Sequence, residues 1–219
     1  MAPLTPVYWQ TISPPMHQLL RLLGQASLLR DFYLAGGTAL ALRLGHRYSI
    51  DLDFFSTTNW VERPTRRIII DMLSALQVQV LEDVDGNLLL RALDVHIGFF
   101  GYGHPLLAST DDVEGVAVAS ITDIGLMKLD ALISRGSRKD FYDLYMIMQT
   151  IPLPDLLALG RAKYPYARDF ELMAVESLVF FENADRDLQP QLLLDLPWAA
   201  VRDFFTEQAR QLGNQWFGR

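Results

Sequence analysis

Residues 50–55 read Ile50-Asp51-Leu52-Asp53-Phe54-Phe55, and thirteen residues separate Asp51 from the glycine pair Gly36-Gly37. Acidic and apolar residues alternate here, which predicts a strand with Asp51 and Asp53 on one face and the apolar side chains on the other. Two neighbouring carboxylates repel each other, and a bound divalent cation such as Mg²⁺ relieves that repulsion. The pair is therefore a candidate metal site for phosphoryl or nucleotidyl chemistry. The alternative is a solvated strand end.

The glycine pair lies in Ala35-Gly36-Gly37-Thr38, which follows the short apolar segment 32–35. The pattern predicts a strand that turns into a short helix over residues 39–44, with Thr38 as its N-cap and Gly45 at its end. Glycine lets the backbone approach a ligand closely, and amides at a helix start can hold phosphate oxygens. Gly36, Gly37 and Thr38 are thus candidates for binding a triphosphate. A glycine pair alone can also mark a simple turn.

A third acid, Asp94, lies between Leu93 and Val95 in the segment 88–100, which is predicted as one strand. A buried, unpaired acid is costly, so Asp94 is expected to join Asp51 and Asp53 at the metal and to accept a proton from the attacking hydroxyl. The alternative is an acid at a strand edge or turn. His96, on the same predicted face, is interpreted as a packed histidine, or as one that supports a metal ligand, rather than as a ligand itself.

The order of predicted elements indicates an α/β (α+β) fold followed by a helical part. Helices are expected at 16–29 and 62–76, and strands at 32–35, 50–55, 78–84, 88–100 and 113–118. After Ser120 the pattern is helical, at 121–134, 138–149, 153–163, 167–181 and 197–216. We therefore expect a core domain over residues 1–115 and a helical domain over 116–219 that completes the active-site cleft.

The glycine pair, the Asp-x-Asp strand and the later strand acid resemble the nucleotidyltransferase superfamily typified by DNA polymerase beta. A narrower resemblance, over about residues 30–150, is to the AbiEii/AbiGii (MenT-like) toxin family. It rests on the segments 34–40 and 47–55 and on a helical motif, Lys128-Leu129-Asp130-Ala131-Leu132, followed by Arg135 and by Lys139-Asp140-Phe141-Tyr142-Asp143-Leu144-Tyr145.

This resemblance implies a nucleotidyltransferase-like mixed sheet flanked by helices, with an NTP as substrate and Mg²⁺ as cofactor. It implies transfer of a nucleotide to RNA or protein, with a tRNA 3′ end as acceptor in MenT-like enzymes and a separate antitoxin as partner in AbiE-type systems. Lys128 would neutralise the triphosphate, and the alternative is an exposed lysine.

Three further residues are candidates for nucleotide binding. Arg47 and Ser49 precede the acid pair and are in reach of a phosphate, although Arg47 is also interpretable as a solvated loop residue. Asp143 is expected to orient Lys128 or Arg135, or to contact the nucleotide, against the alternative of a surface pair with Lys139. Asp140 reads as a helix-capping partner of Ser137.

Composition excludes several classes of protein. The chain of 219 residues is half apolar, carries a formal charge of −7 and has no cysteine, which excludes a disulfide scaffold, a thiol nucleophile and a thiolate zinc site. The negative charge argues against a protein that binds nucleic acid through overall electrostatic attraction. No membrane span or secretory signal is visible, so we expect a cytoplasmic protein. Two other functions remain open: a catalytically silent nucleotide-binding module, and nucleotidylation of a small molecule.

Overall fold

The computed structural model describes residues 1–217, and the chain divides into two compact units, the first ending at Ser120 and the second beginning at Ile121. The first unit extends beyond the expected boundary at residue 115. Residues Val116–Val118 form strand β8, which pairs with the sheet of the first unit and so keeps this segment there.

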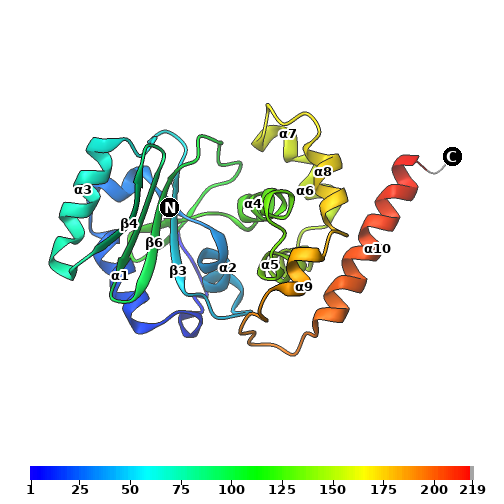
Figure 1. Ribbon diagram of the computed structural model, residues 1–219, viewed down its shortest axis with the longest axis horizontal. Helices are drawn as coiled ribbons and strands as arrows, with labels where there is room; N and C mark the ends of the chain where they lie inside the picture. Colours follow the sequence, from blue (N-terminus) through cyan, green and yellow to red (C-terminus); the bar gives the residue numbers. More distant parts are fainter. Residues whose placement is uncertain (218–219) are drawn as a thin grey trace. The chain divides into compact units, whose positions relative to one another are not determined.

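A mixed, eight-stranded sheet forms the first unit (Figure 1), with the order β1-β7-β8-β2-β3-β6-β5-β4. Its strands are β1 (Ala2–Pro3), β2 (Tyr33–Leu34), β3 (Asp51–Ser56), β4 (Gln79–Val84), β5 (Asn87–Ala92), β6 (Val95–Gly101), β7 (Asp111–Val113) and β8 (Val116–Val118). The central strands β3 and β6 run parallel. The expected α/β fold with a mixed sheet is confirmed.

Alternation along β3 separates an apolar face from a polar one. Leu52 and Phe54 are fully buried, whereas Asp51 and Asp53 are half-buried on the opposite face. Phe54 stacks on Phe99 of β6, with ring centroids 5.2 Å apart. Apolar burial against this face stabilises the strand and so fixes which way the two carboxylates point.

The helices of the first unit are α1 (Pro14–Gly24), α2 (Gly36–Leu44) and α3 (Arg63–Leu73), with short 3₁₀ turns at Trp9–Thr11, Ser27–Asp31 and Ser74–Leu76. The Ser13 side chain accepts a hydrogen bond from the Met16 amide at the start of α1. The helix expected over 16–29 is therefore shorter, since its last part is the 3₁₀ turn. Helix α2 lies against β3 and ends at Gly45, which has the left-handed conformation expected there.

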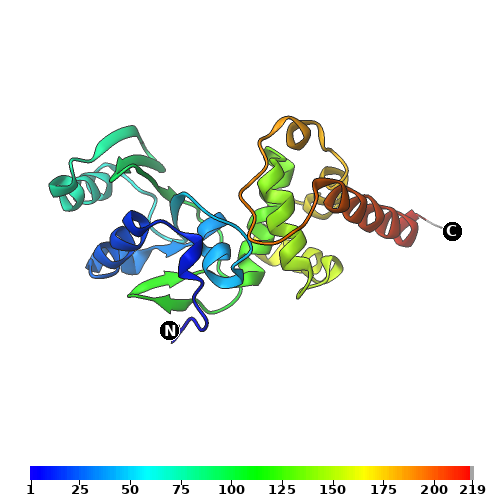
Figure 2. The ribbon, with the colours of Figure 1, turned by 90° about the horizontal axis from the view of Figure 1, so that it is seen from below.

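The second unit is helical. It consists of α4 (Ile121–Ser134), α5 (Arg138–Met148), α6 (Leu153–Ala158), α7 (Gly160–Lys163), α8 (Phe170–Ser177), α9 (Glu182–Arg186) and α10 (Trp198–Phe217). Helices α4 and α5 lie side by side (Figure 2). Phe141 of α5 contacts the rings of Phe181, Trp198 and Phe205, so an aromatic cluster joins α5 to α10.

Helix α10 is 20 residues long, and it buries Val201, Phe205 and Leu212 while it exposes Arg202, Asp203 and Arg210. Among residues 1–217, no helix is both long enough and apolar enough to pass through a bilayer.

Candidate active site on the glycine turn and strand β3

The two acids of β3 lie at its beginning, beside the parallel strand β6. Asp51 is opposite His96, and Asp53 is opposite Gly98. Residues directly opposite in a sheet point to the same face, so these four positions form one polar row. The Asp53 Oδ1 atom is 3.1 Å from the place that a Cβ on Gly98 would take. That Cβ would also come within 2.4 Å of the Phe100 ring, so the glycine makes room first for this ring and then for the Asp53 carboxylate.

The glycine turn meets the same carboxylate. Gly36 begins α2 with a φ of +65°, and a Cβ added there would stand 3.3 Å from the Asp53 Oδ2 atom. The Ala35 amide donates to the Asp53 carbonyl at 3.0 Å, which ties the turn to β3. The sequence spacing predicts that the glycine turn lies beside the strand of Asp51 and Asp53, and in the structure the turn contacts β3 in this way.

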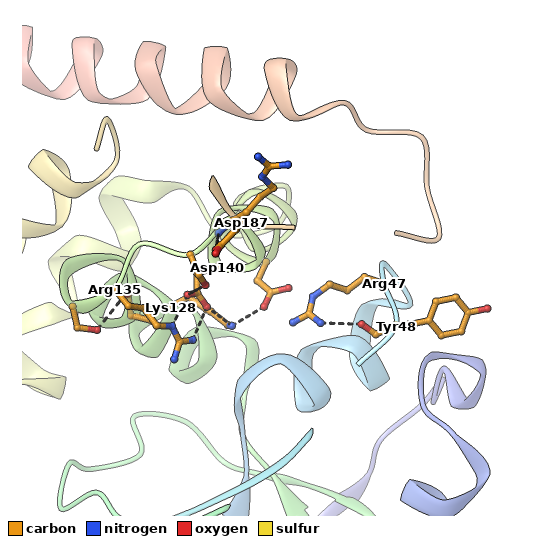
Figure 3. Close-up of polar contacts among 11 residues, drawn as sticks. Arg47, Tyr48, Lys128, Arg135, Asp140 and Asp187 are labelled. Atoms are coloured by element: carbon orange, nitrogen blue, oxygen red, sulfur yellow. Dashed lines mark hydrogen bonds and ion pairs between the residues drawn. The ribbon is translucent and has the colours of Figure 1, made fainter. Parts of the chain in front are cut away.

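Arg47 lies against the first turn of α2. Its side chain is almost fully buried, and a Cβ on Gly37 would come within 2.2 Å of its Nη2 atom. Its Nη1 donates to the Tyr48 carbonyl at 2.9 Å, as Figure 3 shows. The alternative of a solvated loop residue is wrong, because the guanidinium is buried. Gly37 is required for that position, and the result is a cation beside the amides at the start of α2.

Thr38 is the third residue of α2 and not its N-cap, because the helix begins at Gly36. Its buried hydroxyl donates to the Asp51 carbonyl. The Ser49 hydroxyl lies 2.8 Å away. A hydroxyl has one proton and a carbonyl only accepts, so Ser49 donates to Thr38. These two hydroxyls hold the start of β3 in place.

Asp94 is not in the middle of a strand. The expected strand 88–100 is two strands, β5 and β6, and Leu93 and Asp94 form the turn between them, with φ values of 51° and 62°. The Asp94 side chain is 90% exposed and lies 2.9 Å from the Arg91 guanidinium. Neither residue is glycine, so the sequence carries no signal for this two-residue turn. The alternative of a turn acid is correct. The argument for metal binding assumed a buried, unpaired acid, and Asp94 is exposed and paired with Arg91.

Within residues 1–217, no group of three His, Cys, Asp or Glu side chains is already assembled around one point. The donor set nevertheless fits Mg²⁺, which binds through one or two carboxylates together with substrate phosphates and water. Two half-buried carboxylates beside a helix start meet that requirement. His96 is the additional neighbour: its Nδ1 atom is 3.4 Å from the Asp51 Oδ1 atom.

The helical motif forms a buried network in the second unit (Figure 3). The Lys128 Nζ atom is 2.8 Å from Asp140 Oδ1 and 2.6 Å from Asp143 Oδ2, and both carboxylates are fully buried. Arg135 donates from Nε to the second Asp140 oxygen at 2.8 Å. The alternative of an exposed Lys128 is wrong. Asp143 forms an ion pair with Lys128, and because it is fully buried the alternative of a surface pair with Lys139 is wrong.

Asp140 is the centre of this network and not a capping residue. Its side chain accepts from the Ser137 hydroxyl at 2.5 Å, while the Ser137 side chain makes no capping hydrogen bond. Burial alone would raise the pKa of the Asp140 carboxyl, but Lys128 and Arg135 together hold that pKa well below its usual range.

A second buried pair has no counterpart in the sequence interpretation. Lys163 Nζ lies 2.8 Å from Asp123 Oδ1, and neither side chain is exposed. Burial lowers the pKa of the Lys163 ammonium, and the Asp123 carboxylate opposes this shift. The pair is separated by 40 positions in the sequence, which hides it from pattern analysis.

Comparison with known families gives one match over most of the chain. The model of the nucleotidyl transferase AbiEii toxin family, of type IV toxin–antitoxin systems, matches residues 18–211. An uncharacterized protein of Aquifex aeolicus (strain VF5), aq_aa25, is 36% identical over 192 residues, which cover 84% of this chain and 89% of that protein.

Solved structures share the fold at low identity. The nucleotidyltransferase toxin MenT4 (Rv2826c) of Mycobacterium tuberculosis H37Rv superposes with a TM-score of 0.59 at 19% identity, covering 89% of this chain and 81% of that one. The antibiotic-resistance factor ANT(2″)-Ia superposes with a TM-score of 0.53 at 16% identity, covering 68% of this chain and 90% of that one.

Proposed function

This chain belongs to the AbiEii family of nucleotidyltransferase toxins, and from that premise we propose that it transfers a nucleoside monophosphate from an NTP to a hydroxyl of an acceptor with the help of Mg²⁺. The hydroxyl oxygen forms a bond to the α-phosphorus, the bond between the α-phosphorus and its bridging oxygen to the β-phosphate breaks, and pyrophosphate leaves. The hydroxyl proton passes to solvent or to a base.

One observation carries this proposal: the Asp53 carboxylate lies 3.3 Å from the Cβ position of Gly36, so the acid pair of β3 and the amides that begin α2 share one place. Amides at a helix start attract phosphate oxygens, and paired carboxylates attract a hard divalent cation. An NTP with its metal ion needs both kinds of group side by side.

The residues of the first unit take distinct roles. Asp51 and Asp53 hold the metal ion, which neutralises charge on the phosphates when bound. Gly36 and Gly37 present the backbone to the triphosphate, and the Arg47 guanidinium beside them stabilises its negative charge. Thr38 and Ser49 act on Asp51 through the hydrogen bonds that hold the start of β3.

We further propose a tRNA 3′ end as the acceptor and a cognate antitoxin as a partner, in the cytoplasm, where NTPs and tRNA are found. The family, a toxin family of toxin–antitoxin systems, supports the antitoxin partner, and the tRNA acceptor follows from the resemblance to MenT-like enzymes. A protein acceptor is the other candidate of the same reaction. The assignment of Lys128 to the triphosphate stays a prediction, as does a helical domain that completes the active-site cleft.

The test is incubation of the full chain with each α-³²P-labelled NTP, MgCl₂ and either total tRNA or cell lysate. Label is expected on tRNA with the wild type, and Asp51→Asn and Asp53→Asn are expected to abolish the transfer. The matched control is Asp71→Asn, an exposed acid of α3. Equal transfer by wild type and Asp51→Asn would overturn the proposed site.

The product identifies the acceptor. Label on a protein band would indicate the same transfer reaction with a protein as the acceptor. Label on a low-mass product would indicate small-molecule nucleotidylation, for which the shared fold of ANT(2″)-Ia is the only support. NTP binding without label transfer to any acceptor would indicate a catalytically silent nucleotide-binding module.

A further inference from the structure

Strand β6 lies parallel to β3, which carries the two acids, and it has no acid on the row that faces them. The row reads His96, Gly98 and Phe100, opposite Asp51, Asp53 and Phe55. Phe55 and Phe100 stack with centroids 4.9 Å apart, which confirms that the opposed side chains share a face. The place opposite Asp53 is a buried glycine, and the place opposite Asp51 is a histidine.

His96 is placed to donate a nitrogen where a third carboxylate is missing. Its Nδ1 atom is 3.4 Å from the Asp51 Oδ1 atom, and its side chain is 58% exposed. Two neighbouring ligands of an octahedral ion at 2.0–2.1 Å are about 3 Å apart. One cation can therefore contact both atoms after a small movement of an exposed ring.

The cation that lies opposite His96 on the neighbouring strand is paired with an acid. Arg91 lies opposite His96 on β5, and its guanidinium pairs with Asp94 at 2.9 Å. This turn acid thus neutralises the cation on the strand next to His96. The arrangement leaves the His96 ring beside the Asp51 carboxylate as the next polar side chain of the row.

Resting on the proposed function, we propose that His96 is a metal-binding side chain of this site, completing a set of two carboxylates and one imidazole with Asp51 and Asp53. Imidazole nitrogen suits transition-metal ions better than Mg²⁺, whereas carboxylates suit both Mg²⁺ and Mn²⁺. The site therefore binds Mn²⁺ more tightly, relative to Mg²⁺, than two carboxylates alone would.

The experiment measures binding of the metal alone to the full chain. Free Mn²⁺ is followed by electron paramagnetic resonance, and Mg²⁺ by its competition with Mn²⁺. His96→Ala is expected to weaken Mn²⁺ binding at least about tenfold while changing Mg²⁺ binding less. His96→Asp, which adds a carboxylate, is expected to bind Mg²⁺ more tightly than His96→Ala does. The matched control is His17→Ala, a half-exposed histidine that is also paired with an acid, at 2.9 Å from Glu114.

A second readout is specific for ligation by the ring. The chain has four histidines, so their imidazole ¹⁵N resonances are separable, and diamagnetic Zn²⁺ is expected to shift the Nδ1 resonance of His96. This measurement needs neither catalysis nor a folded variant. An unshifted His96 resonance at saturating Zn²⁺ would overturn the proposal.

The outcomes separate this inference from the proposed function. Metal binding that is lost in Asp51→Asn but unchanged in His96→Ala overturns the role of His96 and leaves the acid pair intact. Mn²⁺ binding that is unchanged in Asp51→Asn, or absent from the wild type, overturns the metal site itself. In that case the labelled-NTP assay decides independently whether transfer occurs.

Discussion

The Asp53 carboxylate lies directly against Gly36, with its Oδ2 atom 3.3 Å from the point where a Cβ on that glycine would stand. Helix α2 can begin here because Gly36 adopts a φ of +65°, a conformation that costs an L-residue about 1–2 kcal/mol. One glycine therefore serves both the turn and the placement of an acid.

Gly36→Ala is expected to lower nucleotidyl transfer sharply, because the added methyl presses on Asp53 as well as straining the turn. The control is Gly86→Ala, since Gly86 has a φ of +88° but no atom within 4 Å of its Cβ position. Both variants should lose about 1–2 kcal/mol of unfolding free energy, measured by urea titration. Equal activities of the two variants would show that contact with Asp53 is irrelevant.

Gly37→Ala tests the buried Arg47 guanidinium. The new Cβ would lie 2.2 Å from Arg47 Nη2, so the guanidinium must move. We expect a rise in the KM for NTP because the guanidinium is displaced from the triphosphate, and Arg47→Met should also raise this KM because it removes the cation. Gly213→Ala is the control, since it lies in α10 with open space around its Cβ position. An unchanged KM in both variants contradicts the role of Arg47.

Thr38→Val removes a hydroxyl from a buried site without changing its shape much. The Asp51 carbonyl and the Ser49 hydroxyl each lose a partner, which costs about 1–3 kcal/mol of stability. We expect kcat to fall because the start of β3 is no longer held, and we expect Thr38→Ser to restore it. If Thr38→Ser is as impaired as Thr38→Val, packing of the methyl group and not the hydrogen bond is what matters.

The sequence predicted the acid pair and its glycine turn because both signals are local: alternation fixes a strand face, and thirteen residues fit one helix. It misplaced Asp94 because Leu93-Asp94 forms a tight turn without glycine, so two strands read as one. It did not show that His96 is exposed beside Asp51, since strand register is a property of pairing and not of one segment.

The helical motif shows a different limit. Helical spacing placed Lys128 and Arg135 on one face and gave α4 its bounds, 121–134. Spacing alone did not show that Asp140 pairs with Lys128 and Arg135 and does not cap its helix. These ion pairs join α5 to α4 and to the residue after it. A capping pattern describes the ends of one helix, and a buried ion pair depends on how helices pack.

Lys128→Met separates a structural role for this network from a catalytic one. The change leaves Asp140 and Asp143 without their shared cation, and breaking such a buried pair costs about 3–5 kcal/mol of unfolding free energy. The double variant Lys128→Met/Asp143→Asn has one buried carboxylate fewer and should recover part of that stability. If transfer activity recovers together with stability, Lys128 is structural, and if activity stays absent, the predicted role toward the triphosphate is supported.

Acid should destabilise the helical unit through Asp140. The folded-state pKa of its carboxyl is below the ordinary value of 3.8, so its contribution to stability is fully present above that value and is lost as pH falls below it. We expect the unfolding free energy, measured by urea titration, to fall between pH 5 and pH 3, and Asp140→Asn to show a smaller fall over the same range. The variant should start about 3–5 kcal/mol less stable at pH 5, since Lys128 and Arg135 each lose the buried carboxylate that they share. An identical fall in both proteins would mean that other acids, and not Asp140, govern the acid sensitivity of this unit.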